Sequence, residues 1–183
     1  MTSAPTPASP ERASDPLLTA ARLLLALFIG LLLFAAVFVA IGIGAMLTIQ
    51  RGEVFERIAA AGAPASSYGL VMLGFALVLA ILLLTARFLL ELRRIVDSVR
   101  HGDPFQPGNA DRLRLMGWIA VATQIVWLAV VGIARWAAQF LDEDRRLPEA
   151  NLGSGLLLIL VLFILARVFR VGAEMREELD GTV

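Results

Sequence analysis

The side chains that most often perform chemistry in enzymes are sparse in this sequence. Its single histidine, His101, has no partner for a metal-ligand set, because the chain contains no cysteine and no second histidine. No glycine-rich loop carries a lysine, so a phosphate-binding loop of the Walker type is excluded. His101 is more simply interpreted as a solvated turn residue, and the sequence implies neither a metal nor a cofactor.

The acidic residues do not form a catalytic arrangement either. Adjacent acids occur in the segment 142–144 and at Glu177 and Glu178, and both groups adjoin arginines outside the apolar stretches. Charge runs of this kind usually form water-exposed faces. Because no acid, base or nucleophile converges at a helix end, we expect that the protein is not an enzyme.

Polar residues within the apolar stretches are the next place to look for function. Carriers of ions or protons normally keep an ionisable residue at mid-depth in the membrane, and no Asp, Glu, Lys or His lies there. Thr123 and Gln124 are the best polar candidates, and Gln124 is placed to hydrogen-bond to another helix. Such residues usually act as structural contacts between helices, although a transport role is the alternative.

These few polar residues are embedded in a very apolar chain. Of its 183 residues, 58% are hydrophobic and only 17% are charged, whereas about a quarter are charged in typical soluble domains. The formal net charge is zero, so direct binding to nucleic acid has no support. The composition is that of a membrane protein, and the lipid bilayer is its first expected partner.

Four uncharged stretches are long enough to cross a bilayer or nearly so. The first has 27 residues, Leu23–Ile49, and the last has 15, Leu152–Ala166, which spans if Arg167 extends its side chain to the interface. We predict an all-α integral membrane protein, a four-helix bundle with spans at about 23–49, 68–90, 113–135 and 152–170. The Pro- and Ser-rich residues 1–19 are predicted to be a disordered tail, and residues 20–183 form the membrane domain.

The distribution of arginines predicts the orientation. The segments that share a side with the two termini carry 11 arginines, and the two opposite loops carry 5. The positive-inside rule therefore places both termini in the cytoplasm. Every basic residue is arginine and none is lysine, which suggests a GC-rich bacterial genome and hence the inner membrane of a bacterium. The second and fourth helices should extend into the cytoplasm, the second as an amphipathic helix that continues to Arg100 and ends before Gly102 and Pro104.

Several local contacts follow from this topology. Arg87 lies at the cytoplasmic end of its span, where it either extends its side chain to the interface or pairs with Glu91 one turn later. Asn109 is predicted to cap the third helix, because its side chain can accept a hydrogen bond from an otherwise unpaired backbone amide. We also expect the turn at 101–114 to pack against the C-terminal helix, with Arg112 or Arg114 paired to a glutamate. The three glutamates in reach are Glu174, Glu177 and Glu178.

Two cytoplasmic segments, 102–117 and 166–183, together resemble a bacterial membrane family known as domain of unknown function 2975. The turn pattern of the family is met by Gly102, Pro104, Phe105, Asn109, Arg112, Leu113 and Arg114. Its closing pattern is met by Phe169, Arg170, Gly172, Glu178, Asp180, Thr182 and Val183. The resemblance covers the chain from about residue 20 to its end and implies a four-span protein.

The resemblance also implies a class of partner. Many relatives are encoded beside small helix-turn-helix regulators, which suggests a membrane partner for a DNA-binding protein. No catalytic residue is carried over, and the motif residues also make sense as turns and caps, with Gly181 ending the last helix. The leading hypothesis is an interaction or regulatory protein that acts through the turn at 101–114 and the C-terminal helix. The alternative is an oligomeric transport or permeation unit, and formation of a homo-oligomer stays open.

Overall fold

The chain folds into helices alone within the residues that the structure describes. The structure is a computed structural model, and it describes residues 16–49, 51–60, 62–64, 66–100, 106–140 and 152–180. Its five helices are α1 (Pro16–Thr48), α2 (Arg51–Ala60), α3 (Ser67–Arg100), α4 (Pro107–Ala138) and α5 (Leu152–Asp180). The predicted all-helical fold is confirmed.

Four of these helices, α1, α3, α4 and α5, are long and apolar enough to cross a membrane. They contain the four uncharged stretches of the sequence except Ile49, which directly follows α1, and each extends beyond its stretch at one end or both. These four helices indicate a multi-pass membrane protein. Helix α1 begins at Pro16, so residues 16–19, which the sequence assigned to the tail, are helical. Proline suits a first helical position, because its fixed φ is already helical and it lacks the amide hydrogen that would be unpaired there.

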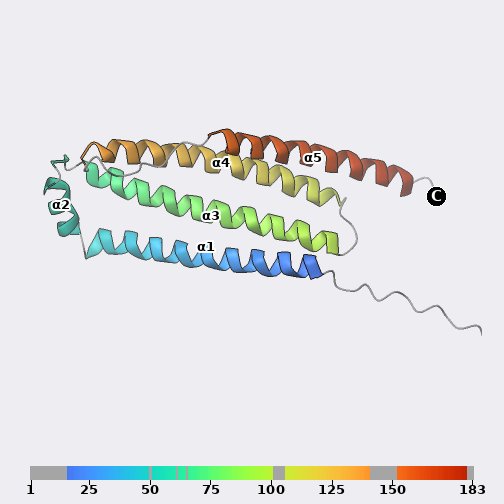
Figure 1. Ribbon diagram of the computed structural model, residues 1–183, viewed down its shortest axis with the longest axis horizontal. Helices are drawn as coiled ribbons and strands as arrows, with labels where there is room; N and C mark the ends of the chain where they lie inside the picture. The colour runs from blue at the N-terminus through green and yellow to red at the C-terminus, as the bar shows by residue number, and fades with distance from the viewer. Residues whose placement is uncertain are drawn as a thin grey trace, which may run out of the picture.

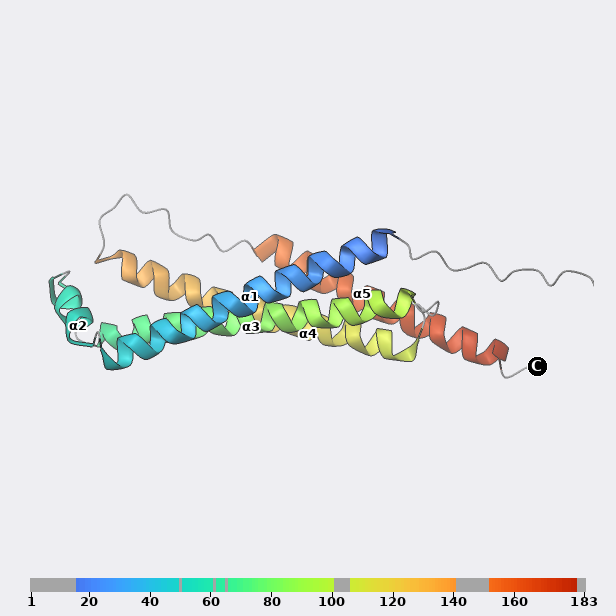
Figure 2. The same ribbon diagram turned by 90° about the horizontal axis from the view of Figure 1, so that it is seen from below.

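The long helices lie side by side in a row, in the order α1, α3, α4, α5 (Figure 1). Each is antiparallel to its neighbour, as the second view also shows (Figure 2). Among the described residues, α1 and α5 make no close backbone contact with each other. The four predicted spans are thus arranged as an open row, with α1 at one edge and α5 at the other.

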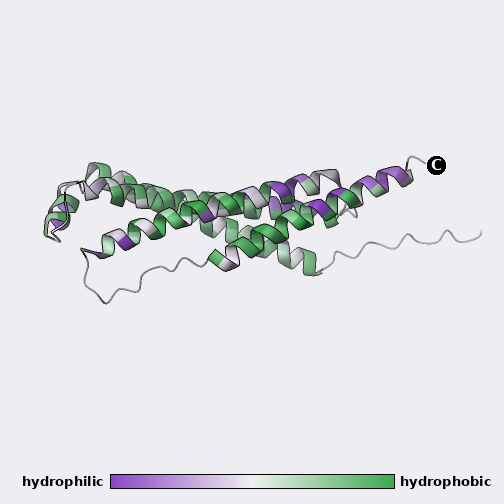
Figure 3. Cartoon of the chain, turned by 90° about the horizontal axis from the view of Figure 1, so that it is seen from above, coloured by the Kyte–Doolittle hydropathy of each residue, from purple (hydrophilic) through white to green (hydrophobic). Residues whose placement is uncertain are grey.

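The open row exposes apolar side chains along both edges. On α1, Leu27 is 68% exposed and Phe34 is 60% exposed, and on α5 Leu157 is 62% exposed. Figure 3 shows these hydrophobic stretches along the middle of the long helices, with hydrophilic residues gathered toward the ends. In a bilayer such side chains face acyl chains and need no protein partner.

One end of the row carries most of the arginines. There α1 begins, α3 ends, α4 begins and α5 ends, as the ion pairs Arg22–Asp97 and Asp111–Arg170 show. We call it the arginine-rich end. The predicted extension of α3 is confirmed as a helix to Arg100, but it is packed between neighbours. Phe88, Leu92 and Ile95 of this extension pack against a core cluster formed by α4 and α5.

The opposite end is closed by α2, a ten-residue helix that the sequence analysis did not predict. It turns across the ends of the long helices (Figure 1). The Phe55 ring stacks on Tyr68, with ring centres 4.7 Å apart, and the Tyr68 hydroxyl donates to the Met46 carbonyl at 3.0 Å. Beyond α2, Gly62 has φ of +70°, a conformation that glycine adopts without the strain a side chain would bring.

Close approach of α4 and α5 depends on small residues. The Phe163 ring lies so near Gly117 that a Cβ there would come within 3.1 Å of the ring. Further along the same contact, a Cβ on Gly155 would overlap the side-chain oxygen of Gln124. Shape complementarity of this kind is the main source of helix association in lipid, where no hydrophobic effect acts between helices.

This packing predicts different results for two glycines on the same helix. Gly117→Leu should lower the free energy of unfolding by about 1–3 kcal/mol more than Gly132→Leu, because the Phe163 ring fills the space at Gly117. No heavy atom lies within 4 Å of a Cβ at Gly132, so this control carries the same change in helix propensity without a clash. Thermal unfolding in detergent measures both variants, and equal destabilisation would contradict the packing of α4 on α5.

Candidate functional site

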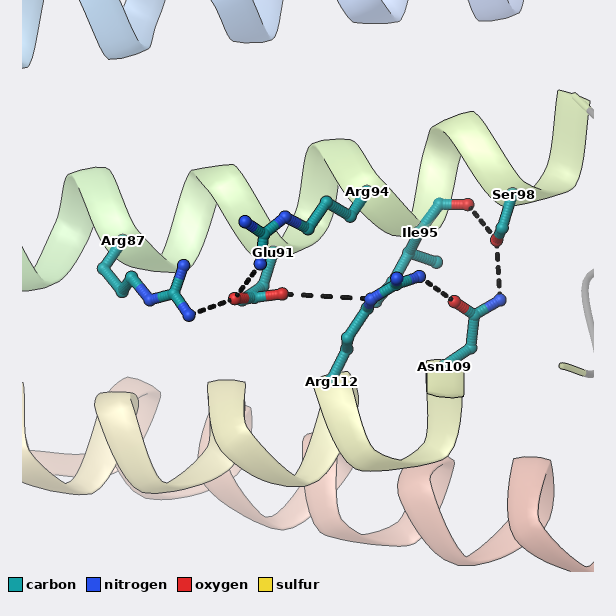
Figure 4. Close-up of polar contacts among 7 residues, drawn as sticks. All are labelled: Arg87, Glu91, Arg94, Ile95, Ser98, Asn109 and Arg112. Carbon is teal, nitrogen blue, oxygen red and sulfur yellow. Dashed lines mark hydrogen bonds and ion pairs between the residues drawn. The ribbon is translucent and has the colours of Figure 1, made fainter. Parts of the chain in front are cut away.

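A buried carboxylate lies at the arginine-rich end, between α3 and α4. Glu91 is only 1% exposed, although it is one of the few charged residues near the apolar part of α3. Arg87 Nη2 lies 2.6 Å from its Oε1, and Arg94 Nη1 donates to the same oxygen at 2.9 Å. From α4, Arg112 Nε lies 4.0 Å from Oε2 (Figure 4). The predicted pair between Arg87 and Glu91 is confirmed, with two further arginines around it.

The same interface holds a chain of hydrogen bonds next to the carboxylate. Asn109, which is fully buried, donates from Nδ2 to Ser98 Oγ at 2.6 Å. The Ser98 hydroxyl donates in turn to the Ile95 carbonyl at 2.7 Å, and Arg112 Nη1 donates to Asn109 Oδ1 at 2.9 Å. Arg112 thus bridges the two parts of the network (Figure 4). We call the six residues Arg87, Glu91, Arg94, Ser98, Asn109 and Arg112 the α3–α4 network.

The predicted capping role of Asn109 is wrong. Helix α4 begins two residues earlier, at Pro107, and the residue in the N-cap position is Gln106, whose side chain makes no capping bond. The backbone amide of Asn109 donates to the Gln106 carbonyl at 2.8 Å, so Asn109 already lies in the first helical turn. Its side chain turns toward α3, where it donates to Ser98, and it also accepts from Arg112 of its own helix. The residue type suits a cap, but the neighbouring helix offers a hydrogen bond across the interface.

The contact between the turn and the C-terminal helix is also different from the prediction. The start of α4 does pack on α5, but the charges are reversed: Arg170 Nη2 of α5 donates to Asp111 Oδ1 of α4 at 3.1 Å. The predicted pair of Arg112 or Arg114 with a C-terminal glutamate is not formed. Successive residues on a helix point about 100° apart, so Asp111 faces α5 while Arg112 faces α3.

The other predicted site residues have separate positions. Arg114 is exposed beside α5, Phe169 is half-buried against the core cluster, and Glu178 is exposed near the end of α5. Asp180 is the last residue of α5. The motif residues Gly102, Pro104 and Phe105 lie outside the described residues, as do His101 and Gly181.

Three residues that join helices were not predicted to do so. Glu91 was expected only to pair with Arg87, although a carboxylate with arginines four residues before and three residues after it can be buried as an ion pair. Ser98 gave no signal, since a serine near a helix end is common. Asp111 suits the positive start of a helix, and nothing in the sequence pairs it with Arg170.

The polar residues in the middle of α4 are engaged locally. The Thr123 hydroxyl donates to the Ile119 carbonyl of its own helix at 2.8 Å. Gln124 reaches α5, where its oxygen lies against Gly155, but its Nε2 is buried without a hydrogen-bond partner. The predicted hydrogen bond from Gln124 to another helix is therefore not formed in the described part of the chain.

Chemically, the α3–α4 network combines charge-assisted contacts around Glu91 with neutral hydrogen bonds through Asn109 and Ser98. Its one carboxylate is engaged by guanidinium groups and is buried from water. Within the described residues, no three His, Cys, Asp or Glu side chains lie close enough to hold a metal ion. The network is suited to joining two helices.

The family comparison covers the helices that form this network. The model of the family described as "Protein of unknown function (DUF2975)" matches residues 47–183. The chain belongs to the DUF2975 family. The DUF2975 match includes α2, α3, α4 and α5, and it begins later than the residue 20 expected from the sequence motifs, so nearly all of α1 precedes it. No curated protein and no solved structure was found to match the chain.

The position of Glu91 predicts a large effect of its removal in this DUF2975 protein. Glu91→Ala should lower the free energy of unfolding by about 1.5–3 kcal/mol, because it removes the buried carboxylate that accepts the contacts of Arg87 and Arg94. Glu53→Ala is the matched control. Glu53 is also paired with an arginine one turn away, at 2.7 Å, but both side chains are more than half exposed.

An exposed pair of this kind contributes less than about 1 kcal/mol. Denaturation in detergent, followed by circular dichroism, measures the two variants under the same conditions. Similar small losses for Glu91→Ala and Glu53→Ala would show that Glu91 is accessible to water.

Proposed function

We propose that this DUF2975 protein is a non-enzymatic interaction protein that binds a soluble cytoplasmic protein through the free end of α5. It would lie in the inner membrane of a bacterium, with its arginine-rich end and both termini in the cytoplasm. The observation that carries the proposal is the projection of α5 beyond the ends of α1, α3 and α4, which is plain in both views (Figures 1 and 2).

The C-terminal part of α5 has an exposed apolar stripe, and only the outer end of this stripe lies beyond the ion pair of Arg170 with α4. Val168, Val171 and Met175 are 54%, 37% and 56% exposed. Their spacing of three and four residues places them on one face of the helix. Met175 lies about 7 Å beyond Arg170 along the helix. It is therefore farther from the apolar stretch of α5 than Arg170, the last arginine that contacts α4. An apolar stripe on a helix in water is suited to binding in the groove of another protein.

Acidic side chains surround this stripe. Glu174, Glu177 and Glu178 are all exposed, and Arg176 is the basic residue among them. A partner with a basic surface would be attracted to this end of α5. The family resemblance suggests a small helix-turn-helix regulator, and DNA-binding proteins of that kind carry a basic face. If α5 binds the basic face of such a regulator, it would compete with DNA for that face.

The rival function, an oligomeric permeation unit, has less support. A pore needs polar side chains that line one face of a span. In α4 the Thr123 hydroxyl is bonded within its own helix, and Gln124 is packed against Gly155 of α5. Both side chains therefore contribute to the contacts of a single chain.

The orientation in this proposal rests on the 11 to 5 division of arginines. Cytoplasmic reporters fused after residue 100 and after Val183 should be active, whereas fusions near Gly62 and Pro148 should report the opposite side of the membrane. An external location for the fusion after Val183 would place the end of α5 away from any cytoplasmic protein and would refute the proposed function.

The interaction itself is tested by photocrosslinking in cells. A photoreactive residue at position 175 should form an adduct with a soluble basic protein, because Met175 lies in the exposed stripe. The same residue at position 157 is the control: Leu157 is equally exposed on α5 but lies in the apolar stretch, where only lipid should react.

Charge dependence makes this test specific. Replacement of Glu174, Glu177 and Glu178 by glutamine should weaken the adduct at position 175 while leaving the amount of protein in the membrane unchanged. If no protein adduct forms at position 175, or if its yield is independent of the glutamates, the proposed interaction is wrong.

A further inference from the structure

A second feature of the α4–α5 contact is a small basic pocket. It has a volume of about 150 Å³ and is lined by Arg114, Phe163, Ala166, Arg167 and Arg170. Three guanidinium groups thus converge on one pocket in a chain whose formal net charge is zero. The basic character is therefore local and is not a property of the whole surface.

The arginines of the pocket are only partly neutralised. Arg170 donates to Asp111 at 3.1 Å, which fixes the position of its guanidinium group. In the part of the chain that the structure describes, no carboxylate pairs with Arg114 or Arg167. Two like charges at one pocket repel each other, and an anion between them would remove this cost. Guanidinium groups bind phosphate oxygens in pairs with favourable geometry.

The pocket lies at the level where the apolar stretches end. Arg114 directly precedes the uncharged stretch of α4, and Arg167 directly follows that of α5. One turn further into the apolar region, Trp118 and Phe163 meet edge to face with ring centres 5.6 Å apart, and Trp118 is 56% exposed. Exposed apolar residues continue below them on α5, among them Leu160 at 57%. Tryptophan is enriched at this depth in membrane proteins.

We propose that this pocket binds the phosphate of an anionic phospholipid, with Arg114 and Arg167 on the phosphate and Trp118 and Phe163 against the upper acyl chain. Basic pockets between membrane helices on the cytoplasmic side suit anionic headgroups. A free phosphate ion would use the arginines but would gain nothing from the apolar surface below them. The inference does not depend on the proposed protein interaction, which uses the outer part of α5.

The neighbouring surface limits the headgroup. A second cavity of about 340 Å³ follows along the same contact, and its lining includes Asp111, Glu174 and Glu177 as well as Arg170. These carboxylates would repel a headgroup with several phosphates, but they can accept hydrogen bonds from hydroxyl groups. The site therefore fits a single phosphodiester whose headgroup is uncharged and hydroxylated, as in phosphatidylglycerol.

The test uses the full chain in detergent and measures its affinity for phosphatidylglycerol by native mass spectrometry. Arg114→Gln combined with Arg167→Gln should weaken binding by about twenty-fivefold, because each arginine near an anionic headgroup contributes about a factor of five. The control is Arg57→Gln combined with Arg135→Gln, which removes two exposed arginines at the opposite end of the row. This control should retain the affinity of the original chain.

Further arms separate the alternatives. Phosphatidylcholine carries the same phosphodiester with a cationic headgroup and should bind weakly, and inorganic phosphate should not compete with phosphatidylglycerol. Equal losses in both double variants would show general attraction to an anionic surface, and competition by inorganic phosphate would show a site for free phosphate. Either result overturns the lipid site.

A loss of folding must be distinguished from a loss of binding. Circular dichroism should show the same helix content in all variants, and Arg114→Lys combined with Arg167→Lys should keep part of the affinity because the charges remain. If the folded lysine variant binds phosphatidylglycerol as weakly as the original chain binds phosphatidylcholine, the phosphate contact requires the paired hydrogen bonds of guanidinium groups. Unchanged binding of phosphatidylglycerol by the folded glutamine variant refutes the site.

Discussion

The arrangement of the long helices depends on the contact of α3 with α4, where the carboxylate of Glu91 is buried. The row consists of two edge helices, α1 and α5, that each pack on a single long neighbour, and the contact of α3 with α4 joins the two halves. In lipid there is no hydrophobic effect to hold such halves together, so packing and polar contacts must do so. Glu91 and Asn109 supply the polar contacts at the arginine-rich end.

The same junction decides what the start of α4 presents to its surroundings. Because Asn109 and Arg112 are fixed against α3, the rotation of the helix turns Asp111 toward Arg170 of α5. Arg114 then lies beside Arg167 at the basic pocket. One polar contact between α3 and α4 thus sets the geometry of the surface between α4 and α5, which carries the proposed lipid site.

Much of this architecture was predictable because it rests on local patterns. The four uncharged stretches gave the four long helices, and the spacing of Arg87 and Glu91 gave their ion pair. The burial of Glu91 was not predictable, because the rule that charged faces meet water fails where a second helix brings another arginine. Likewise, Asn109 suits both a cap and a bond across helices, and only the presence of Ser98 on the neighbouring helix decides between them.

Other features depend on three-dimensional proximity that no spacing reveals. The pair of Asp111 with Arg170 joins residues far apart in the chain. The start of α4 does pack on α5, but the expected pair had the arginine on α4 and the carboxylate on α5, which is the reverse of the observed pair. The short helix α2 has Val54 and Ile58 one turn apart, and this pattern was available but is weak in ten residues. The open row also leaves no trace in the sequence, because lipid-facing and protein-facing residues are equally apolar.

A double-mutant cycle between Glu91 and Arg112 tests most directly whether the buried carboxylate joins α3 to α4. The free energies of unfolding of Glu91→Gln, Arg112→Gln and the double variant are compared with that of the original chain in one detergent. If the two side chains interact across the helices, the double variant should be less destabilised than the two single losses added together, by about 1 kcal/mol or more. Additive losses, within about 0.5 kcal/mol, would contradict the account.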